Sequence, residues 1–240
     1  TRVWEKWSIP AEEAPQKEII KAVKLYLAMR QIAEKENVRG IGMPCWGEEP
    51  KVIDYTPACL AYTRLFEERG ILGACEGDTL SLTTMFIIHR FFSLPVMMSN
   101  VYPFLMKEPM RKHEKIDKLP EVEKPEDCLR IAREFTVRPS VPGFFPSERI
   151  AIDARLSAGK ITLVKLHPLL NKIHVVEAKL ERYVQFPHSD CRNGALVRIK
   201  DGRKFANTLY SHHYCLFPGH QEKEDLGLLG EILNLEIEEL

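Results

Sequence analysis

The stretch from Ile71 to Asn100 places the strongest constraint on the fold. It reads as a short apolar strand (Ile71–Ala74), an acidic turn, an apolar helix from about Thr79 to Phe92, and a second apolar strand (Pro95–Met98). A helix between two buried strands is typical of α/β proteins, in which helices cover parallel strands. Such proteins bind ligands where strands end and helices begin. The acidic turn is therefore the first place to look for chemistry.

The segment before this stretch has the same alternation of elements. Apolar residues recur at helical spacing over Pro15–Asn37, a short strand candidate follows at Val38–Met43, and a second helix is expected over Pro57–Arg69. Gly70 is a typical stop signal for that helix. Three strands that alternate with three helices predict a parallel, Rossmann-like sheet in this part of the chain.

The pattern changes after residue 103. A proline-rich, charged connection leads into several stretches that alternate apolar and polar residues, which is typical of half-buried strands. We expect strands at Cys128–Val137, Arg149–Leu156, Ile161–Leu166, Ile173–Glu181, Ala195–Ile199 and Tyr214–Phe217, then a helix over Gln221–Leu233 and a final short strand. The predicted fold class is therefore α/β, with a Rossmann-like domain in residues 1–103 and a mostly antiparallel, barrel-like β domain in residues 104–240.

Composition excludes several classes of protein. Lys+Arg and Asp+Glu number 34 each, so the formal net charge is zero and the basic excess of a nucleic-acid binder is absent. No apolar run is long enough to cross a bilayer, so we expect no membrane association. The six cysteines are scattered without paired spacing. This pattern is typical of reduced thiols, and we expect a cytoplasmic protein.

Glu76 and Asp78 form the acidic turn, and two interpretations of them are open. In the first, Asp78 caps the following helix and Glu76 complements the helix dipole. In the second, Glu76 is a hard oxygen ligand for a divalent cation and a proton acceptor. Spacing alone favours the first interpretation.

A second cluster lies near the C-terminal end of the chain, in the segment SHHYCLFPGH (211–220). Its three histidines and Cys215 suggest zinc, but their spacing matches no closed structural zinc pattern. Side chains alternate along an extended segment, so His212 and His213 are expected on opposite faces, with at most one of them in a given site. Taken alone, the segment is more typical of a polar strand edge than of a metal site.

The two clusters together resemble the L-fucose isomerase-like family (fucose/arabinose isomerase type). The resemblance is carried by the run GILGACEGD (70–78) with its apolar helix and PVMMSN (95–100), and by HHYCLFPGH (212–220) with the helix and strand after it. It covers about residues 22–240, in which the family has its second α/β domain and its C-terminal domain. Members usually have an additional N-terminal α/β domain, which closes the active site of a neighbouring subunit. The resemblance does not include that domain.

The resemblance implies aldose–ketose isomerisation of a sugar through a cis-enediol(ate), assisted by a divalent cation that is usually manganese. By position, Glu76 matches the family's glutamate ligand and base, and His213 matches its histidine ligand. The family's third ligand is an aspartate, for which this chain has Asn100. The asparagine can offer a carbonyl oxygen to a metal but no negative charge and no proton acceptor. Asp78 and Glu134 are candidates to replace the missing carboxylate, and a homo-oligomer, trimer or hexamer, is expected.

Three functional hypotheses follow. The leading one is a metal-dependent sugar isomerase, or the catalytic portion of one, with Glu76, Asn100 and Asp78 as candidate catalytic residues and Glu76, His213 and Asn100 as candidate metal ligands. The second is a non-catalytic sugar-binding or oligomerisation domain descended from the same family, which Asn100 and the uncovered N-terminal domain favour. The third is a structural zinc protein built on the histidine cluster.

Overall fold

A computed structural model describes residues 15–44, 56–113, 116, 118–133, 138–140, 151–153, 157–185 and 193–240. Contacts within the chain divide it into two units, which are described separately. Unit 1 comprises residues 1–82 and 134–155, and unit 2 comprises residues 83–133 and 156–240. These units do not test the expected division of the chain at residue 104, which stays a prediction.

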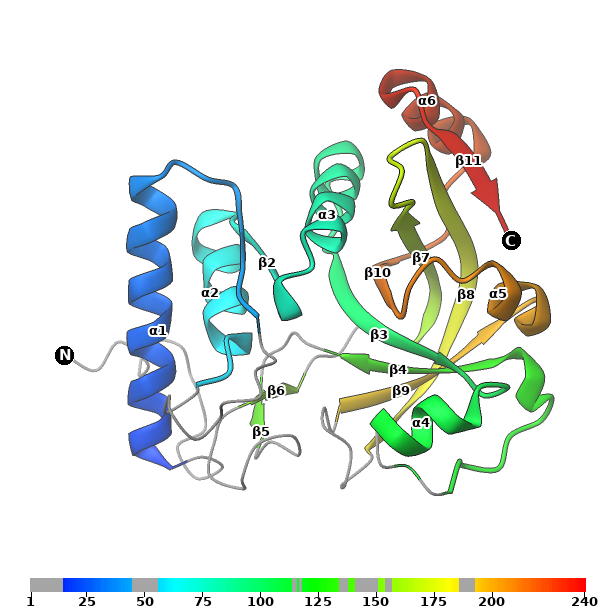
Figure 1. Ribbon diagram of the computed structural model, residues 1–240, viewed down its shortest axis with the longest axis horizontal. Helices are drawn as coiled ribbons and strands as arrows, with labels where there is room; N and C mark the ends of the chain where they lie inside the picture. Colours follow the sequence, from blue (N-terminus) through cyan, green and yellow to red (C-terminus); the bar gives the residue numbers. More distant parts are fainter. Residues whose placement is uncertain are drawn as a thin grey trace. The chain divides into compact units, whose positions relative to one another are not determined.

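Unit 1 is built on two helices that lie side by side (Figure 1). The elements of the unit are α1 (Gln16–Lys35), β1 (Gly40–Gly42), α2 (Cys59–Arg69), β2 (Leu72–Ala74), the 3₁₀ turn η3 (Cys75–Gly77), β5 (Arg138–Ser140) and β6 (Ala151–Asp153). β1 and β2 pair in parallel, whereas β5 and β6 pair antiparallel. Gly70 ends α2 in the left-handed conformation, as predicted. Both helices and both parallel strands were expected from the sequence.

The core of unit 1 lies between the helices and extends to β2. Its buried side chains include Tyr26, Met29, Ala61, Tyr62, Leu65 and Ile71. Tyr62 packs so closely on Gly73 of β2 that a Cβ at this glycine would lie 2.2 Å from the tyrosine ring. The Tyr62 hydroxyl accepts a hydrogen bond of 2.7 Å from the backbone N–H of Met43. The aromatic side chain therefore connects α2 with β2 and with the residue that follows β1.

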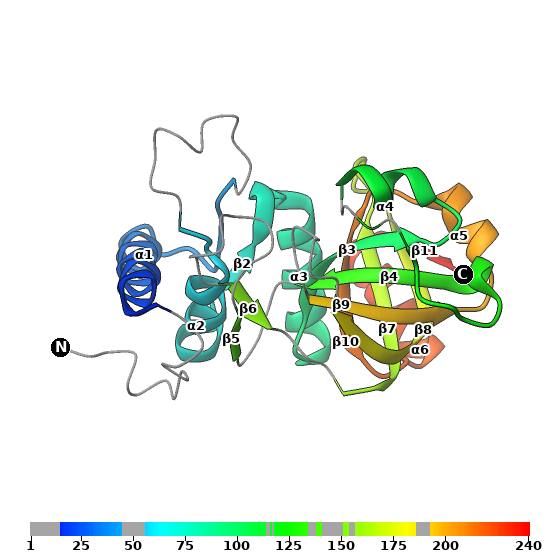
Figure 2. The ribbon, with the colours of Figure 1, turned by 90° about the horizontal axis from the view of Figure 1, so that it is seen from below.

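Unit 2 is organised around a closed antiparallel barrel of six strands (Figures 1 and 2). The strand order is β8–β7–β10–β3–β4–β9, and the pairing of β8 with β9 closes the barrel. The strands are β3 (Met97–Pro103), β4 (Cys128–Arg133), β7 (Gly159–Leu166), β8 (Lys172–Gln185), β9 (Asn193–Ile199) and β10 (His213–Pro218). The antiparallel, barrel-like arrangement expected for the second part of the chain is confirmed.

Helices and one further strand complete unit 2. Strand β11 (Glu236–Glu239) joins β8 in parallel outside the barrel. The remaining elements are α3 (Thr79–Phe92), whose first turn belongs to unit 1, α4 (Lys107–His113), the 3₁₀ turn η4 (Pro125–Asp127), α5 (Gly202–Thr208) and α6 (Lys223–Leu233). Asp201 caps α5 by accepting a hydrogen bond from the backbone N–H of Lys204. No helix among the described residues is long and apolar enough to span a membrane.

The expectation of a three-stranded parallel sheet is wrong. The strand predicted at Pro95–Met98 forms as β3 two residues later, and it pairs antiparallel with β4 and β10 rather than with β2. Among the described residues, the parallel sheet that contains β1 has two strands, and they show no Rossmann-like fold. All seven residues of β3 are buried. A continuously buried strand looks the same in sequence whether it lies in a parallel sheet or in a closed barrel.

Candidate functional site

Asn100 on β3 and His213 on β10 are directly opposite in the barrel wall. The backbone N–H of Val101 donates to the carbonyl of His212 at 2.6 Å, so the hydrogen bonds flank the Asn100–His213 pair. This is the non-hydrogen-bonded type of antiparallel pair, in which opposite side chains approach most closely. Both residues are buried, with exposed fractions of 6% and 4%. Two of the residues singled out from the sequence are thus brought together, although 113 positions separate them in the sequence.

The side-chain oxygen of Asn100 is buried and has no hydrogen-bond partner among the described residues. Leaving a buried acceptor unsatisfied costs about 1–3 kcal/mol. An amide carbonyl oxygen can be satisfied by a hydrogen-bond donor or by a hard cation. The position therefore fits a ligand that approaches the Asn100–His213 pair.

His212 and His213 lie together, contrary to the expectation that they occupy opposite faces. Their ring centroids are 3.9 Å apart and the rings are tilted by 48°. Strand alternation begins only at His213, where β10 starts, whereas His212 lies in the bend before the strand. The hydroxyl of Ser211 tightens this bend, since it donates to the carbonyl of His213 at 2.9 Å and accepts from its N–H at 3.1 Å. The two imidazoles therefore lie next to each other at the start of β10.

Helix α3 runs along β10 with its N-terminal end toward His213. In the N-terminal half of the helix, the hydroxyl of Thr84 accepts a hydrogen bond of 3.2 Å from the backbone N–H of Leu166, in β7. At the other end of α3, Phe92 stacks on Phe217 with ring centroids 5.9 Å apart. The β7–β10 register, in which Val164 is opposite Cys215, places Leu166 at the His213 end of β10. The two contacts thus fix the direction of the helix on the barrel.

Asp78 caps α3, as the first interpretation of the acidic turn predicted. One carboxylate oxygen accepts from the backbone N–H of Ser81 at 2.8 Å, and the other accepts from the Ser81 hydroxyl at 2.7 Å. The backbone carbonyl of Asp78 accepts the first helical hydrogen bond, from Leu82. This is the expected geometry of an N-cap residue.

Glu76 has an unusual backbone conformation. Its φ of 54° lies in the left-handed region, which costs a residue with a Cβ atom about 1–2 kcal/mol. Gly77 follows with φ of 66°, so two consecutive left-handed residues form the turn between β2 and α3. The Glu76 side chain is half-buried. Strain of this kind is concentrated at functional sites and is therefore a reason to consider a function for the glutamate.

The other candidates do not join this site. His220 lies beyond the far end of β10, where Nε2 is 3.0 Å from the carbonyl of Ala178 and Nδ1 is 3.5 Å from Glu177. His213 begins the six-residue strand β10 and His220 lies beyond its end, about 20 Å away, so the three histidines of this segment do not converge on one zinc ion. Cys215 is a buried residue in the middle of β10. Glu134 lies outside the described residues.

Sequence reasoning missed a group of polar residues beside the histidine pair, at the junction of β8, β10 and β11. Its members are Lys172, His174, Tyr210, Tyr214 and Glu238. Burial lowers the pKa of His174 to about 4, which keeps the imidazole neutral at physiological pH. The residues come from three distant segments, and a sequence motif joins none of them. The only available signal was the polar side chain of His174 within an otherwise apolar strand.

No protein-family model matches the chain, and no curated protein is significantly similar to it.

Proposed function

We propose that this chain is a metal-dependent aldose–ketose sugar isomerase of the L-fucose isomerase-like type, or the catalytic portion of one, acting in the cytoplasm. As an intramolecular oxidoreductase it moves a proton between adjacent carbons of the open-chain sugar through a cis-enediol(ate). A bound divalent cation, manganese in the resembling family, supplies charge stabilisation to the carbonyl and hydroxyl oxygens. The single observation that supports this proposal best is the buried Asn100–His213 pair beside the second imidazole of His212.

The proposal assigns roles to four residues. Glu76, His212 and His213 act as metal ligands. Glu76 offers a carboxylate oxygen, and each histidine offers one imidazole nitrogen. Asn100 contributes its buried carbonyl oxygen. The carboxylate of Glu76 accepts and returns the proton, as a general base within reach of adjacent sugar carbons does.

Asp78 has a supporting role in this proposal. Both of its carboxylate oxygens are engaged by Ser81, so it fixes the turn that carries Glu76 rather than acting as a second base. Two further elements of the proposal come from the resemblance alone. The parallel β1–β2 pair with α1 and α2 is part of a Rossmann-like domain, and the protein assembles as a homotrimer or homohexamer. Light scattering coupled to size-exclusion chromatography measures the assembly directly.

The second candidate is a sugar-binding or oligomerisation domain without catalysis. Asn100 favours it, because an amide at this position provides neither the charge nor the proton acceptor of a carboxylate. The engagement of Asp78 by Ser81 favours it too, since this carboxylate already fulfils a structural role. A sugar that binds saturably but is never converted would identify this candidate.

The test is to incubate the purified chain with Mn²⁺ and a broad panel of aldoses and ketoses in D₂O. NMR then follows both the conversion of sugar and the incorporation of deuterium at the adjacent carbon that receives the proton. We expect conversion with deuterium incorporation, and a loss of at least about 100-fold in Glu76→Gln, since this change removes a positioned base. Glu239→Gln, whose carboxylate pairs with Lys223 at 3.1 Å and is none of the proposed ligands, should retain the activity of the parent. A panel with neither conversion nor exchange would reject the isomerase.

A further inference from the structure

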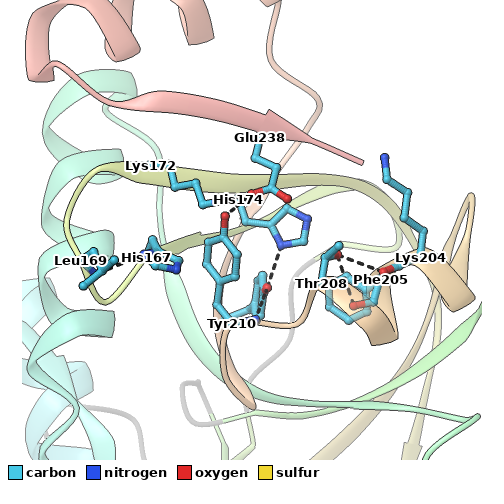
Figure 3. A network of polar contacts seen from close by, with 10 residues as sticks. His167, Leu169, Lys172, His174, Lys204, Phe205, Thr208, Tyr210 and Glu238 are labelled. Atoms are coloured by element: carbon cyan, nitrogen blue, oxygen red, sulfur yellow. Dashed lines mark hydrogen bonds and ion pairs between the residues drawn. The ribbon is translucent and has the colours of Figure 1, made fainter.

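The segment that carries His212 and His213 is bracketed by two tyrosines, Tyr210 and Tyr214. Each tyrosine reaches away from the segment to a different strand outside β10. Figure 3 shows Tyr210 directed toward Glu238 of β11, with Lys172 and His174 of β8 beside it. The histidine pair is thus placed between two side-chain anchors, neither of which is a candidate ligand.

The first anchor is Tyr210. Its hydroxyl donates to a carboxylate oxygen of Glu238, and the same oxygen accepts from the ammonium of Lys172 at 2.8 Å. The Lys172 ammonium also lies 5.5 Å from the centre of the Tyr210 ring. Burial and the bond to Glu238 raise the pKa of Tyr210 to about 12, so the phenol keeps its proton at neutral pH. The bond to Lys172, and then that to Tyr210, lower the pKa of Glu238, which stays a charged acceptor.

The second anchor is Tyr214, which is fully buried. Its hydroxyl oxygen accepts from the backbone N–H of Tyr210 at 3.3 Å and lies 2.8 Å from Nδ1 of His174. The Tyr214 hydroxyl and Nδ1 of His174 thus share one hydrogen bond. Phe205 of α5 packs against both rings, 6.0 Å from His174 and 5.4 Å from Tyr214 between centroids. These contacts leave the second anchor little room to move.

The two anchors are themselves connected. The Tyr214 hydroxyl holds the backbone of Tyr210, and the Ser211 hydroxyl closes the bend on His213. The backbone from residue 210 to residue 214 is therefore fixed at both ends and in the middle. Lys172 and Glu238 also lie on neighbouring strands, because β11 pairs in parallel with β8 and Glu236 is opposite Lys172. Strand β11 is thus connected to the histidine segment through side chains.

From these contacts we propose that the Lys172–Glu238–Tyr210 chain and the His174–Tyr214 pair are positioning residues, which hold the imidazoles of His212 and His213 side by side for one divalent cation. The cation is that of the proposed function, on which this part of the inference rests. Second-layer contacts that fix ligand orientation raise metal affinity, and their loss typically costs about 10–100-fold. The mechanism is preorganisation, because two imidazoles that are already adjacent lose less freedom when the cation binds.

Histidine-selective NMR of the metal-free protein tests the positioning itself. The variants are Tyr210→Phe, which removes the hydroxyl and keeps the ring, and Glu238→Gln, which removes the charge. The matched control is Glu239→Gln, on the next residue of the same strand, whose carboxylate pairs with Lys223 at 3.1 Å. We expect the imidazole signals of His212 and His213 to shift or broaden in both variants, whereas the His220 signal should stay unchanged. In Glu239→Gln, all three histidine signals should stay as in the parent. Leu229→Val shortens a buried side chain of α6 and leaves a small cavity. It therefore shows whether a general loss of stability alone changes the histidine signals.

Co²⁺ binding by calorimetry provides the second readout. We expect the dissociation constant to rise about 10-fold in Tyr210→Phe and in Glu238→Gln, and to stay unchanged in Glu239→Gln. Unchanged His212 and His213 signals in both variants would overturn the inference, and so would equal changes in Glu239→Gln or Leu229→Val. A parent protein that binds no Co²⁺ would count against the cation of the proposed function, whereas the NMR comparison would still decide whether the anchors hold the imidazoles.

Discussion

Asn100 and His213 face each other across β3 and β10, with their side chains on the same face of the barrel wall. The amide oxygen of Asn100 is buried there without a hydrogen-bond partner among the described residues. Burial of an unsatisfied acceptor destabilises the fold, so a ligand that satisfies this oxygen stabilises the protein. The pair is therefore the position at which a single substitution is most informative.

Asn100→Asp places a carboxylate beside His213. Without metal, we expect lower stability, because the buried site then holds an unpaired charge or forces the carboxyl to take up a proton. With Mn²⁺, we expect tighter binding, by about 10-fold or more, since the number of charged ligands sets the affinity of oxygen-rich sites. Calorimetry and thermal unfolding with and without Mn²⁺ measure both effects.

The control for this substitution is Asn207→Asp, which adds the same charge at an exposed position of α5. It should change neither Mn²⁺ affinity nor stability appreciably. Equal Mn²⁺ affinities in the parent and in Asn100→Asp would place Asn100 outside the metal site. Isomerase activity that is found only in Asn100→Asp would support the second candidate function, a domain without catalysis.

The histidine pair predicts which cations the protein prefers. Imidazole nitrogens favour Zn²⁺, Co²⁺ and Ni²⁺ over the harder Mg²⁺ and Ca²⁺. If both rings bind one ion, His212→Gln and His213→Gln should each weaken Co²⁺ binding by at least about 10-fold. His220→Gln should leave the affinity unchanged, because His220 contacts β8 beyond the other end of β10. Loss of binding in only one of the two pair variants would show that the second ring is a neighbour and not a ligand.

Local signals predicted local structure well. The stop at Gly70 and the cap at Asp78 were both read from the sequence, because each depends on a few neighbouring residues. The antiparallel barrel was predicted from strand patterns. The partners of β3 were not, because apolar character does not say which strand lies alongside. The pairing of Asn100 with His213, 113 positions later in the sequence, depends on the whole fold.

The histidine pair shows a second limit of sequence reasoning. Alternation was applied to His212 and His213 as if both were in the strand, whereas β10 begins at His213 and a side-chain bond from Ser211 bends the backbone before it. Strand boundaries carry errors of a few residues, and a shift of one residue reverses the face of a side chain. The positioning contacts of Tyr210 and Tyr214 depend on strands far away in sequence and were therefore not predictable.

His174 should make the protein sensitive to acid. Its pKa is lowered from 6.5 to about 4 by burial, with Lys204 and Lys172 adding to the decrease and Glu238 opposing it. Between these values the unfolded chain binds a proton that the folded protein does not, so stability falls as pH falls from about 6.5 to 4. Over the whole interval the loss is about 3 kcal/mol, at 1.36 kcal/mol for each pKa unit.

Urea unfolding of the parent and of His174→Asn at several pH values isolates this contribution. The parent should lose more stability than the variant between pH 6.5 and pH 4, and the two should respond equally above pH 7. His167→Asn, in the turn before β8, should keep the parent's slope because His174 is still present. Parallel pH profiles for the parent and His174→Asn would contradict the prediction.

Gly202 should not tolerate a side chain. A Cβ atom at this position would lie 1.8 Å from the backbone carbonyl oxygen of Glu126, and the Gly202 N–H donates to Asp127 at 3.2 Å. Gly202→Ala must therefore displace α5 from the 3₁₀ turn η4, at an expected cost of about 3 kcal/mol or more. Gly227→Ala in α6, where a Cβ meets no atom, should instead stabilise the protein by about 0.5–1 kcal/mol. Thermal unfolding of both variants checks the opposite signs.

Glu76→Gly should raise stability and abolish function. The φ of 54° at Glu76 is unfavourable for a residue with a Cβ atom and favourable for glycine, so the substitution should stabilise the protein by about 1 kcal/mol. It also removes the proposed ligand and base, and Mn²⁺ affinity and isomerase activity should fall together. Ser93→Gly is the matched control, because Ser93 has a φ of 55° after the end of α3 and no proposed role. It should gain similar stability while metal binding stays unchanged. If both variants are stabilised and only Glu76→Gly loses metal binding, the strained conformation at Glu76 serves the metal site. Full Mn²⁺ affinity in Glu76→Gly would instead exclude Glu76 from the metal site.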